Sequence, residues 1–285
     1  MRLIWHFMIV RRSVGKLLKR IWLPLMMTAA FVFALTAVHA ADSGWKLVWS
    51  DEFNAPDGEG ADPAKWGFDL GGGGWGNGEL EYYTDRTQNV FHENGCLIIK
   101  VIKEVYEQWW EYTSGRIKTA GKFAWKYGRF EASIKLPHGQ GIWPAFWMLG
   151  DDIETAGWPK CGEIDIMENI GKEPAIVHGT MHGPGYSGSF GLGAPFIFAQ
   201  GKASDGFHVY AVAWEPEAIR WYVDGALYQT RTTAEMVNNM KWVFGHPFFI
   251  ILNVAVGGYW PGKPDASTNF PQQMEVDYVR VYERM

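Results

Sequence analysis

The chain has 285 residues, 26 of them basic and 31 acidic, so its formal net charge at neutral pH is −5. A net acidic chain is a poor partner for nucleic acid and for sulfated or carboxylated polymers, whose charges it would repel. Hydrophobic residues make up 47% of the chain, which is enough for a large core that needs no disulfide or metal.

The first 41 residues are typical of a secretory signal peptide. Residues 2–20 hold six basic residues and no acidic one, an apolar run follows over 21–38, and small residues close the segment at Ala37, Ala40 and Ala41. Cleavage would leave 20 basic residues against 31 acidic ones, a net charge of −11. An uncleaved anchor is the alternative, because a run of about eighteen residues is the short end of a membrane span. The small residues favour cleavage, and hence secretion to the extracellular space or the periplasm.

Residues 42–285 contain no repeat, no low-complexity linker and no change of composition, which predicts a single catalytic domain. Its two cysteines are Cys96 and Cys161. A disulfide and a pair of free thiols are both compatible with an exported protein. We expect a monomer that has no contact with a membrane once the signal peptide is removed.

Short runs rich in Val, Ile, Tyr, Phe and Trp recur between turn residues, which predicts an all-β protein. In chain order these runs cover 46–49, 96–103, 128–136, 162–170, 207–214, 219–225, 248–256 and 274–284. Asp224-Gly225 predicts a hairpin turn, and only 232–241 has a helical pattern. With 34 glycines and 14 prolines, the pattern favours a β-jelly-roll sandwich of two antiparallel curved sheets with a concave substrate groove.

Tryptophan is unusually frequent, with 16 in the chain. Within GQGIWPAFWMLG, residues 139–150, Trp143 and Trp147 lie on one face of a predicted strand. Sugar rings stack their C–H faces on indole, while sugar hydroxyls need fixed polar partners, so tryptophan beside Asn, Arg and carboxylate is typical of a glycan groove. A single tryptophan is more often part of the core, and these two are the exceptions we expect.

The stretch CGEIDIMENIG at 161–171 places three carboxylates within six residues, Glu163, Asp165 and Glu168. In a regular strand Glu163 and Asp165 share a face, whereas Glu168, five residues from Glu163, points to the opposite side. A β-bulge at Ile166-Met167 sets two residues opposite one and brings all three carboxylates to one face. Bulges are frequent beside active sites, so we expect one here.

Two carboxyl groups about 5–5.5 Å apart are what a retaining glycosidase uses, one as nucleophile and one as general acid. Like charges this close cannot all ionise at their usual pKa, so at least one carboxyl should keep its proton at neutral pH. Asp165, between the two glutamates, would hydrogen-bond the nucleophile and fix where the proton lies. A solvated acidic face and a calcium site are alternative explanations of the same pattern.

Longer stretches resemble the family 16 glycoside hydrolases, in the laminarinase branch. The resemblance runs from about Trp49 to Tyr282 and is carried by 161–170 together with WSDEF (49–53), GGGGWGNGELEYYT (71–84), the stretch 114–150, GTMHGPGYSG (179–188) and MEVDYVRVY (274–282). It implies an endo-β-1,3-glucanase that retains configuration, with Glu163 as nucleophile, Asp165 as helper and Glu168 as acid/base. The implied partner is β-glucan, and no cofactor is implied for catalysis.

The same resemblance implies a set of groove residues. These are sugar-hydroxyl contacts at Asn77 and Arg116, stacking walls at Trp143 and Trp147, and further contacts at Trp158 and His182. For His182 the alternative is a histidine held by loop backbone. Related sequences commonly read LQYYT where this chain reads LEYYT, so Glu81 replaces a glutamine and adds a negative charge for which the resemblance gives no role.

A structural Ca²⁺ far from the groove is also implied, held by Glu52, the backbone carbonyl of Gly95 and Asp277. Oxygen-only ligands suit calcium. The alternative is that Glu52 and Asp277 serve the backbone or Arg280.

Other functions are compatible with the same site. A mixed-linkage β-1,3/1,4-glucanase or a glucan transglycosylase would use the same carboxylates, the second with a sugar acceptor in place of water. A non-catalytic β-glucan-binding lectin resembles the family but lacks the paired glutamates, which this chain keeps. An agarase or carrageenase is disfavoured, because a chain with a charge of −11 repels a sulfated polymer and 179–188 resembles the laminarinase loop.

Overall fold

The computed structural model describes residues 44–285, so the predicted signal peptide lies outside the described residues. Those residues fall within one structural unit. Across 44–285, none of the helices has the length and apolar character needed to cross a membrane.

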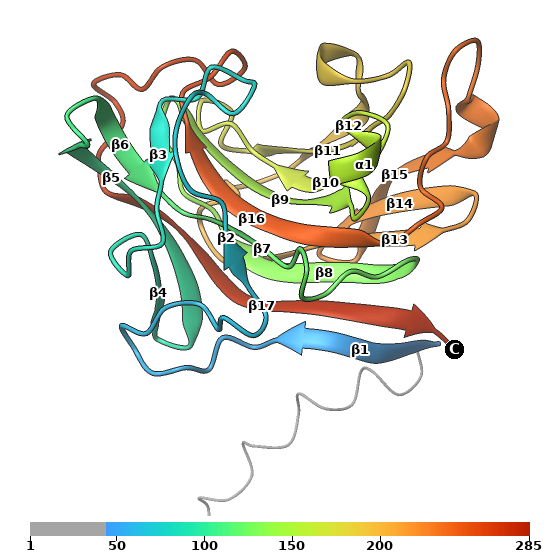
Figure 1. Cartoon of the computed structure of the whole chain (residues 1–285), viewed down its shortest axis with the longest axis horizontal. Coiled ribbons are helices and arrows are strands. Elements are labelled where there is room, and N and C mark those ends of the chain that lie inside the picture. Colours follow the sequence, from blue (N-terminus) through green and yellow to red (C-terminus); the bar gives the residue numbers. More distant parts are fainter. Residues whose placement is uncertain (1–43) are drawn as a thin grey trace, which may run out of the picture. The chain divides into compact units, whose positions relative to one another are not determined.

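The larger of two sheets has ten strands in the order β15-β14-β13-β8-β17-β5-β6-β3, with β1 beside β17 and β4 beside β5 (Figure 1). All its pairs are antiparallel except β3 with β6. Its strands are β1 (Trp45–Asp51), β3 (Glu81–Tyr83), β4 (Val90–Glu93), β5 (Cys96–Tyr106), β6 (Trp110–Ser114), β8 (Gly128–Lys135), β13 (His208–Glu215), β14 (Ala218–Val223), β15 (Ala226–Thr232) and β17 (Gln272–Arg284).

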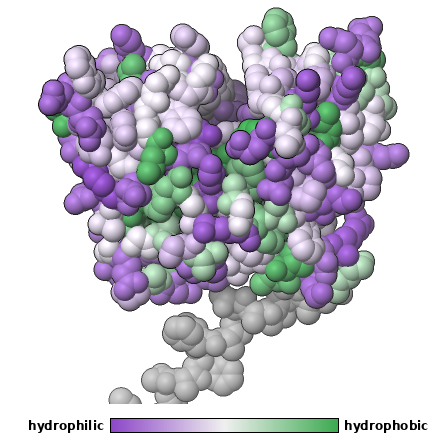
Figure 2. Space-filling view, viewed as in Figure 1, coloured by the Kyte–Doolittle hydropathy of each residue, from purple (hydrophilic) through white to green (hydrophobic). Residues whose placement is uncertain are grey.

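The smaller sheet is antiparallel, in the order β12-β11-β10-β9-β16-β7-β2. Its strands are β2 (Gly67–Phe68), β7 (Arg116–Lys118), β9 (Ile142–Gly150), β10 (Glu163–Glu168), β11 (Ile176–His182), β12 (Leu192–Ile197) and β16 (Phe248–Val256). The helical elements are α1 (Ile153–Ala156) and two 3-10 turns, η1 (Gly188–Phe190) and η2 (Thr233–Glu235). Both sheets curve (Figure 1), and the space-filling view shows a notch between two raised walls above β9 and β10 (Figure 2). The predicted jelly-roll sandwich is confirmed.

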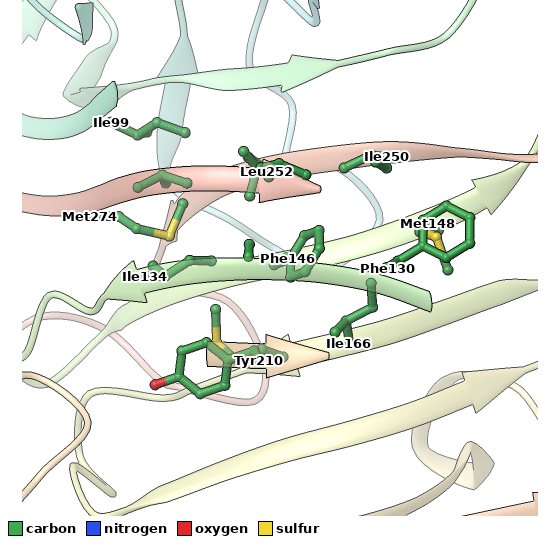
Figure 3. Packing of buried hydrophobic residues seen from close by; sticks show 14 of the residues in the cluster. Ile99, Phe130, Ile134, Phe146, Met148, Ile166, Tyr210, Ile250, Leu252 and Met274 are labelled. Atoms are coloured by element: carbon green, nitrogen blue, oxygen red, sulfur yellow. The ribbon is translucent and has the colours of Figure 1, made fainter. Parts of the chain in front are cut away.

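The main core lies between the two sheets (Figure 3). The larger sheet contributes buried side chains that include Ile99, Phe130, Ile134, Tyr210 and Met274, and the smaller sheet contributes Phe146, Met148, Ile166, Ile250 and Leu252. Full burial of one such side chain stabilises the fold by about 1.5–3 kcal/mol. The core therefore fixes the strand that carries the three carboxylates.

The hairpin predicted at Asp224-Gly225 is confirmed, since Val223 pairs with Ala226. Asp224 and Gly225 have φ values of +50° and +78°, as a two-residue turn with both central residues in the left-handed region requires.

The helix predicted over 232–241 is wrong. Only the single turn η2 forms, closed by a capping box between Thr232 and Glu235. The chain then leaves the helical region, with Asn238 at φ +55°, and the two methionines at 236 and 240 pack against the core. Tertiary packing thus overrides a weak local preference.

Both cysteines are free thiols. Burial raises the pKa of Cys96 and of Cys161 to about 11, so neither is a reactive thiolate at neutral pH. Of the two alternatives left open by the sequence, the structure has the free thiols.

Candidate active site

A β-bulge interrupts β10 at the predicted place. Ile166 and Met167 lie opposite the single residue Gly179 of β11, and the register with β9 shifts at the same point. Both extra side chains are buried in the core. The bulge therefore restores the phase of the strand, so that Glu168 returns to the face of Glu163.

The larger sheet supports the bulge from below. The indole nitrogen of Trp221 donates a hydrogen bond to the carbonyl oxygen of Asp165 at 2.8 Å. This close approach requires glycine at position 179, where a Cβ would come within 2.4 Å of both the Trp221 ring and the hydroxyl of Tyr228. The carbonyl next to the bulge is thus satisfied rather than buried without a partner.

An indole N–H faces each of the two glutamates, Glu163 and Glu168. Trp158 Nε1 donates to Glu163 Oε2 at 2.6 Å, and Trp143 Nε1 donates to Glu168 Oε1 at 3.1 Å. The side chain of Glu163 is only 17% exposed. This enclosure excludes a solvated acidic face as the explanation of the three carboxylates.

His182 joins the carboxylates from β11. Its Nε2 lies 3.1 Å from Asp165 Oδ2 and 4.0 Å from Glu163 Oε1. Asp165 is 2% exposed. His182 therefore belongs to the carboxylate cluster, and it is not held by loop backbone.

Burial and crowding raise the pKa of all three carboxyl groups. The pKa of Glu163 rises to about 8, mainly by burial and then by the charge of Asp165, while His182 and the Trp158 indole oppose the rise. Burial raises the pKa of Asp165 to about 7. The pKa of Glu168 rises well above its ordinary value, first by burial and then by the charge of Asp165, to which Glu163 adds. The cluster therefore retains protons at neutral pH, as a general acid requires.

Aromatic side chains extend from the carboxylates. Trp143 packs edge-on against Trp260 with ring centroids 5.5 Å apart, and Trp260 packs against His178 at 5.0 Å. Trp158 and Trp260 are 48% and 37% exposed. These indoles offer flat faces on which sugar rings can stack.

Arg116 lies between two indole rings. Its guanidinium carbon is 4.7 Å from the centroid of Trp75 and 4.9 Å from that of Trp147. Its Nε donates to Asp69 Oδ2 at 2.9 Å. The ion pair and the two rings hold the guanidinium in one orientation.

The side chain of Asn77 is oriented by Glu79, whose Oε1 accepts a hydrogen bond from Asn77 Nδ2 at 2.9 Å. The carbonyl of Asn77 accepts a hydrogen bond from the backbone N–H of Tyr259 at 2.8 Å. Asn77 is therefore tied to the loop that carries Trp260.

The sequence of the chain matches the model of a known protein family. The model described as glycosyl hydrolases family 16 matches residues 78–280.

The chain belongs to glycosyl hydrolases family 16.

Relatives within family 16 are similar over most of the chain. A β-glucanase of Rhodothermus marinus is 48% identical over 249 residues, which is 84% of this chain and 85% of the relative. The laminarinase catalytic domain of Thermotoga maritima MSB8 is 51% identical with a TM-score of 0.80, covering 85% of this chain and 99% of that one. The endo-β-1,3-glucanase of Pyrococcus furiosus is 49% identical with a TM-score of 0.80, covering 85% and 95%. The predicted family is confirmed.

Four further residues complete the site of this family 16 protein and are not evident in the sequence: Asp69, Glu79, Asn253 and Trp260. Asn253 Oδ1 accepts the indole N–H of Trp147 at 2.8 Å. One signal could have revealed it, since Asn253 is the single polar residue in the apolar run FFIILNVAV. The others lie in loops whose neighbours are set by the fold.

The implied calcium ligands have a mixed fit. Arg280 donates to both carboxylate oxygens of Glu52, at 3.0 and 2.6 Å, so a cation would compete with a guanidinium. Asp277 is exposed at a bulge of β17. Among residues 44–285, the His, Cys, Asp and Glu side chains that lie close enough in a group of three to share one ion are Glu163, Asp165 and His182. A bound calcium at Glu52 would therefore depend on carbonyl oxygens as well.

Proposed function

We propose that the protein is an endo-acting β-1,3-glucanase of the laminarin type that cleaves with retention of configuration. The observation that carries this proposal is the bulge, which places Glu163 and Glu168 on one face of β10, each against an indole N–H of the groove. Membership of family 16 and the names of the relatives support the same activity.

In the first step Glu168 gives its proton to the glycosidic oxygen while Glu163 attacks the anomeric carbon. The bond to the leaving sugar breaks, and a covalent ester to Glu163 forms. Asp165 and His182 flank the nucleophile. The attack requires the ionised form of Glu163, which His182 and the Trp158 indole favour.

In the second step Glu168, now ionised, takes a proton from water, which attacks the same carbon and releases Glu163. Two inversions give net retention. The route uses side chains and water, so no cofactor is part of the proposal. A glucan transglycosylase would differ only in the acceptor, and a mixed-linkage enzyme only in the sugars that the groove accepts.

The test is to incubate the protein with laminarin, curdlan, lichenan, agarose and carrageenan and to size the early products. We expect a rapid fall in the chain length of laminarin, slower attack on lichenan, and no product from agarose or carrageenan. The Glu163→Gln variant is the matched inactive control. Single sugars as the sole early product would contradict endo action, larger products would indicate transfer, and intact laminarin would contradict the proposal.

We propose that the chain is exported and acts as a monomer. Support for export comes from the basic segment, the apolar run and the small residues at 37, 40 and 41. Amino-terminal sequencing of protein from the culture medium should begin at Ala41 or Asp42. An intact Met1 on a membrane-bound protein would contradict cleavage.

A structural calcium remains part of the proposal. Val276 pairs with Leu97 across β17 and β5, so Asp277 lies beside Cys96, which follows Gly95, and two of the three implied ligands are neighbours. At a hundredfold excess over Kd, a ligand of the folded state stabilises it by about 2.7 kcal/mol. A chelator should then lower the melting temperature by roughly 5–10 °C and leave catalysis at low temperature intact. An unchanged melting temperature would contradict the site.

A further inference from the structure

Behind the groove lies a second pair of carboxyl groups, on Glu79 and Glu81, which the proposed reaction does not use. Glu81 opens β3 and has no exposed surface, and Glu79 is 6% exposed. Glu79 bridges to Gly257, just after β16. The pair therefore lies where the two sheets meet.

The two carboxyl oxygens of Glu81 differ in their hydrogen bonding. Oε2 accepts the backbone N–H of Val256 at 2.6 Å. Oε1 is buried and has no hydrogen-bond partner, and the carboxyl of Glu79 lies near enough for its charge to raise the pKa of Glu81. An ionised Oε1 would be a buried negative oxygen facing another carboxylate, which is costly. A proton on Oε1, donated to Glu79, satisfies both groups.

Glu79 is connected to the groove by the hydrogen bonds that it accepts. Its Oε1 accepts from the amide of Asn77 at 2.9 Å and its Oε2 from the hydroxyl of Tyr83 at 3.2 Å. The hydroxyl of Tyr83 in turn accepts from Asn253 Nδ2 at 3.1 Å. Asn253 holds the indole N–H of Trp147 at 2.8 Å. The hydrogen bonds thus run from Glu79, beside Glu81, to two groove residues.

We propose that Glu81 acts as a neutral hydrogen-bond donor to Glu79 and thereby positions Asn77 and Trp147 for the sugar. Glu81 is a positioning residue, since none of its atoms borders the groove. The part that concerns the sugar rests on the proposed function. A buried carboxylic acid kept neutral so that it can donate is a known use of burial.

The charges around Glu81 agree with a neutral form. Burial raises its pKa well above the ordinary value, and the charge of Glu79 raises it further, against the opposing hydrogen bond from Val256. The other titratable neighbour is Tyr83, whose pKa is raised well above its ordinary value by burial and by both glutamates, with Arg116 opposing. No cation among these neighbours pairs with Glu81 directly.

Two substitutions at Glu81 distinguish the loss of its hydrogen-bond donor from a change in side-chain volume. Glu81→Gln keeps the shape, accepts from Val256 through its oxygen, and always donates to Glu79. Glu81→Leu keeps much of the volume and removes the donor. Each is combined with Glu163→Gln, which prevents turnover, and binding of laminarihexaose is measured by calorimetry from pH 6 to pH 9.5.

Glu81→Leu should weaken binding by about tenfold at pH 6, the loss expected when a buried acceptor loses its donor. Glu81→Gln should bind as the parent does, since its amide donates to Glu79 as the neutral carboxyl would. In active enzyme the loss in Glu81→Leu should fall mainly on KM. Binding by Glu81→Leu within twofold of the parent, or a loss in Glu81→Gln as large as that in Glu81→Leu, would overturn the proposal.

An infrared difference spectrum tests the neutral form without any substrate. Wild type minus Glu81→Gln at pH 7 should show the C=O stretch of one protonated carboxyl, and wild type minus Glu59→Gln, which alters an exposed carboxyl, should not. Absence of the band would overturn the proposal even if laminarin is cleaved. Presence of the band in a protein that cleaves no glucan would refute the proposed function and leave Glu81 as the neutral donor.

Discussion

The pair proposed for catalysis, Glu163 and Glu168 (the catalytic pair), and the pair behind the groove, Glu79 and Glu81 (the sealed pair), are both buried carboxyl pairs with different neighbours. Each member of the catalytic pair accepts an indole N–H from a residue of the groove. The sealed pair is bound by backbone, amide and phenol groups, and Glu81 has no exposed surface. Burial and a like charge raise the pKa of a carboxyl in both pairs.

The difference shows that burial alone does not make a carboxyl catalytic. Burial supplies a protonated acid in either place. In the proposed mechanism the groove lets the proton of Glu168 reach a glycosidic oxygen, and the Trp158 indole favours ionisation of Glu163. In the sealed pair no substrate atom can reach the proton, so Glu81 keeps it and acts as a hydrogen-bond donor.

The largest expected effect comes from removing the bulge that creates the catalytic pair. Deletion of Met167 returns β10 to strict alternation and turns Glu168 toward the core. Laminarin hydrolysis should fall by more than about 10³-fold, since a general acid contributes 10²–10⁴. Met167→Leu keeps the residue count and nearly the volume, so it should stay close to wild type. A folded deletion variant with wild-type activity would show that the bulge is not needed.

A smaller effect is expected from the indole that faces the nucleophile. Trp158→Phe removes the 2.6 Å hydrogen bond to Glu163. In wild type this hydrogen bond lowers the pKa of the Glu163 carboxyl. Its loss should raise this pKa, so the acid limb of kcat/KM should move to higher pH, with activity at neutral pH reduced about tenfold. The same substitution should leave the infrared band of Glu81 unchanged. An unshifted acid limb would show that Trp158 does not set the pKa of the nucleophile.

The smallest effect concerns stability, where the two pairs should behave alike. The pKa of Glu163 and of Glu81 is raised above the ordinary value of 4.5, so the folded state binds more protons than the unfolded chain above that pH. The free energy of unfolding of wild type therefore falls as pH rises from about 4.5 toward the folded pKa, which for Glu163 is about 8.

Glu163→Gln and Glu81→Gln remove that loss. Glu163→Gln should be more stable than wild type by roughly 1–3 kcal/mol near pH 8, Glu81→Gln should differ from wild type in the same direction, and both differences should vanish below pH 4.5. Urea unfolding at several pH values measures it. A difference that does not change with pH would mean that the carboxyl has an ordinary pKa.

The sequence predicted the catalytic pair better than the sealed pair, for a physical reason. The carboxylates of 163–168 lie on one strand, so strand periodicity and one bulge suffice to place them together. The sealed pair depends on contacts between distant segments, such as Tyr83 with Asn253, which are 170 residues apart. Periodicity carries no information on which loops meet, so the role of Glu81 was not evident.

The strand predictions are confirmed and the helix prediction over 232–241 is wrong because the segments differ in the strength of their apolar pattern. Strands such as 248–256 carry strong apolar runs that the core selects. The segment 232–241 has a weak pattern, and its methionines pack on the core from a non-helical chain. Its single helical turn is fixed by the capping contacts of Thr232 and Glu235.

The roles of Glu163 and Glu168 are tested most directly by the stereochemistry of azide products. With an activated β-glucoside, Glu163→Ala leaves a space from which azide attacks the anomeric carbon, and the product should be the α-glycosyl azide. Glu168→Ala should still form the covalent intermediate when the leaving group needs no proton, and azide should then give the β product by double displacement. The β azide from Glu163→Ala and the α azide from Glu168→Ala would reverse the roles, and full activity in either variant would contradict the mechanism.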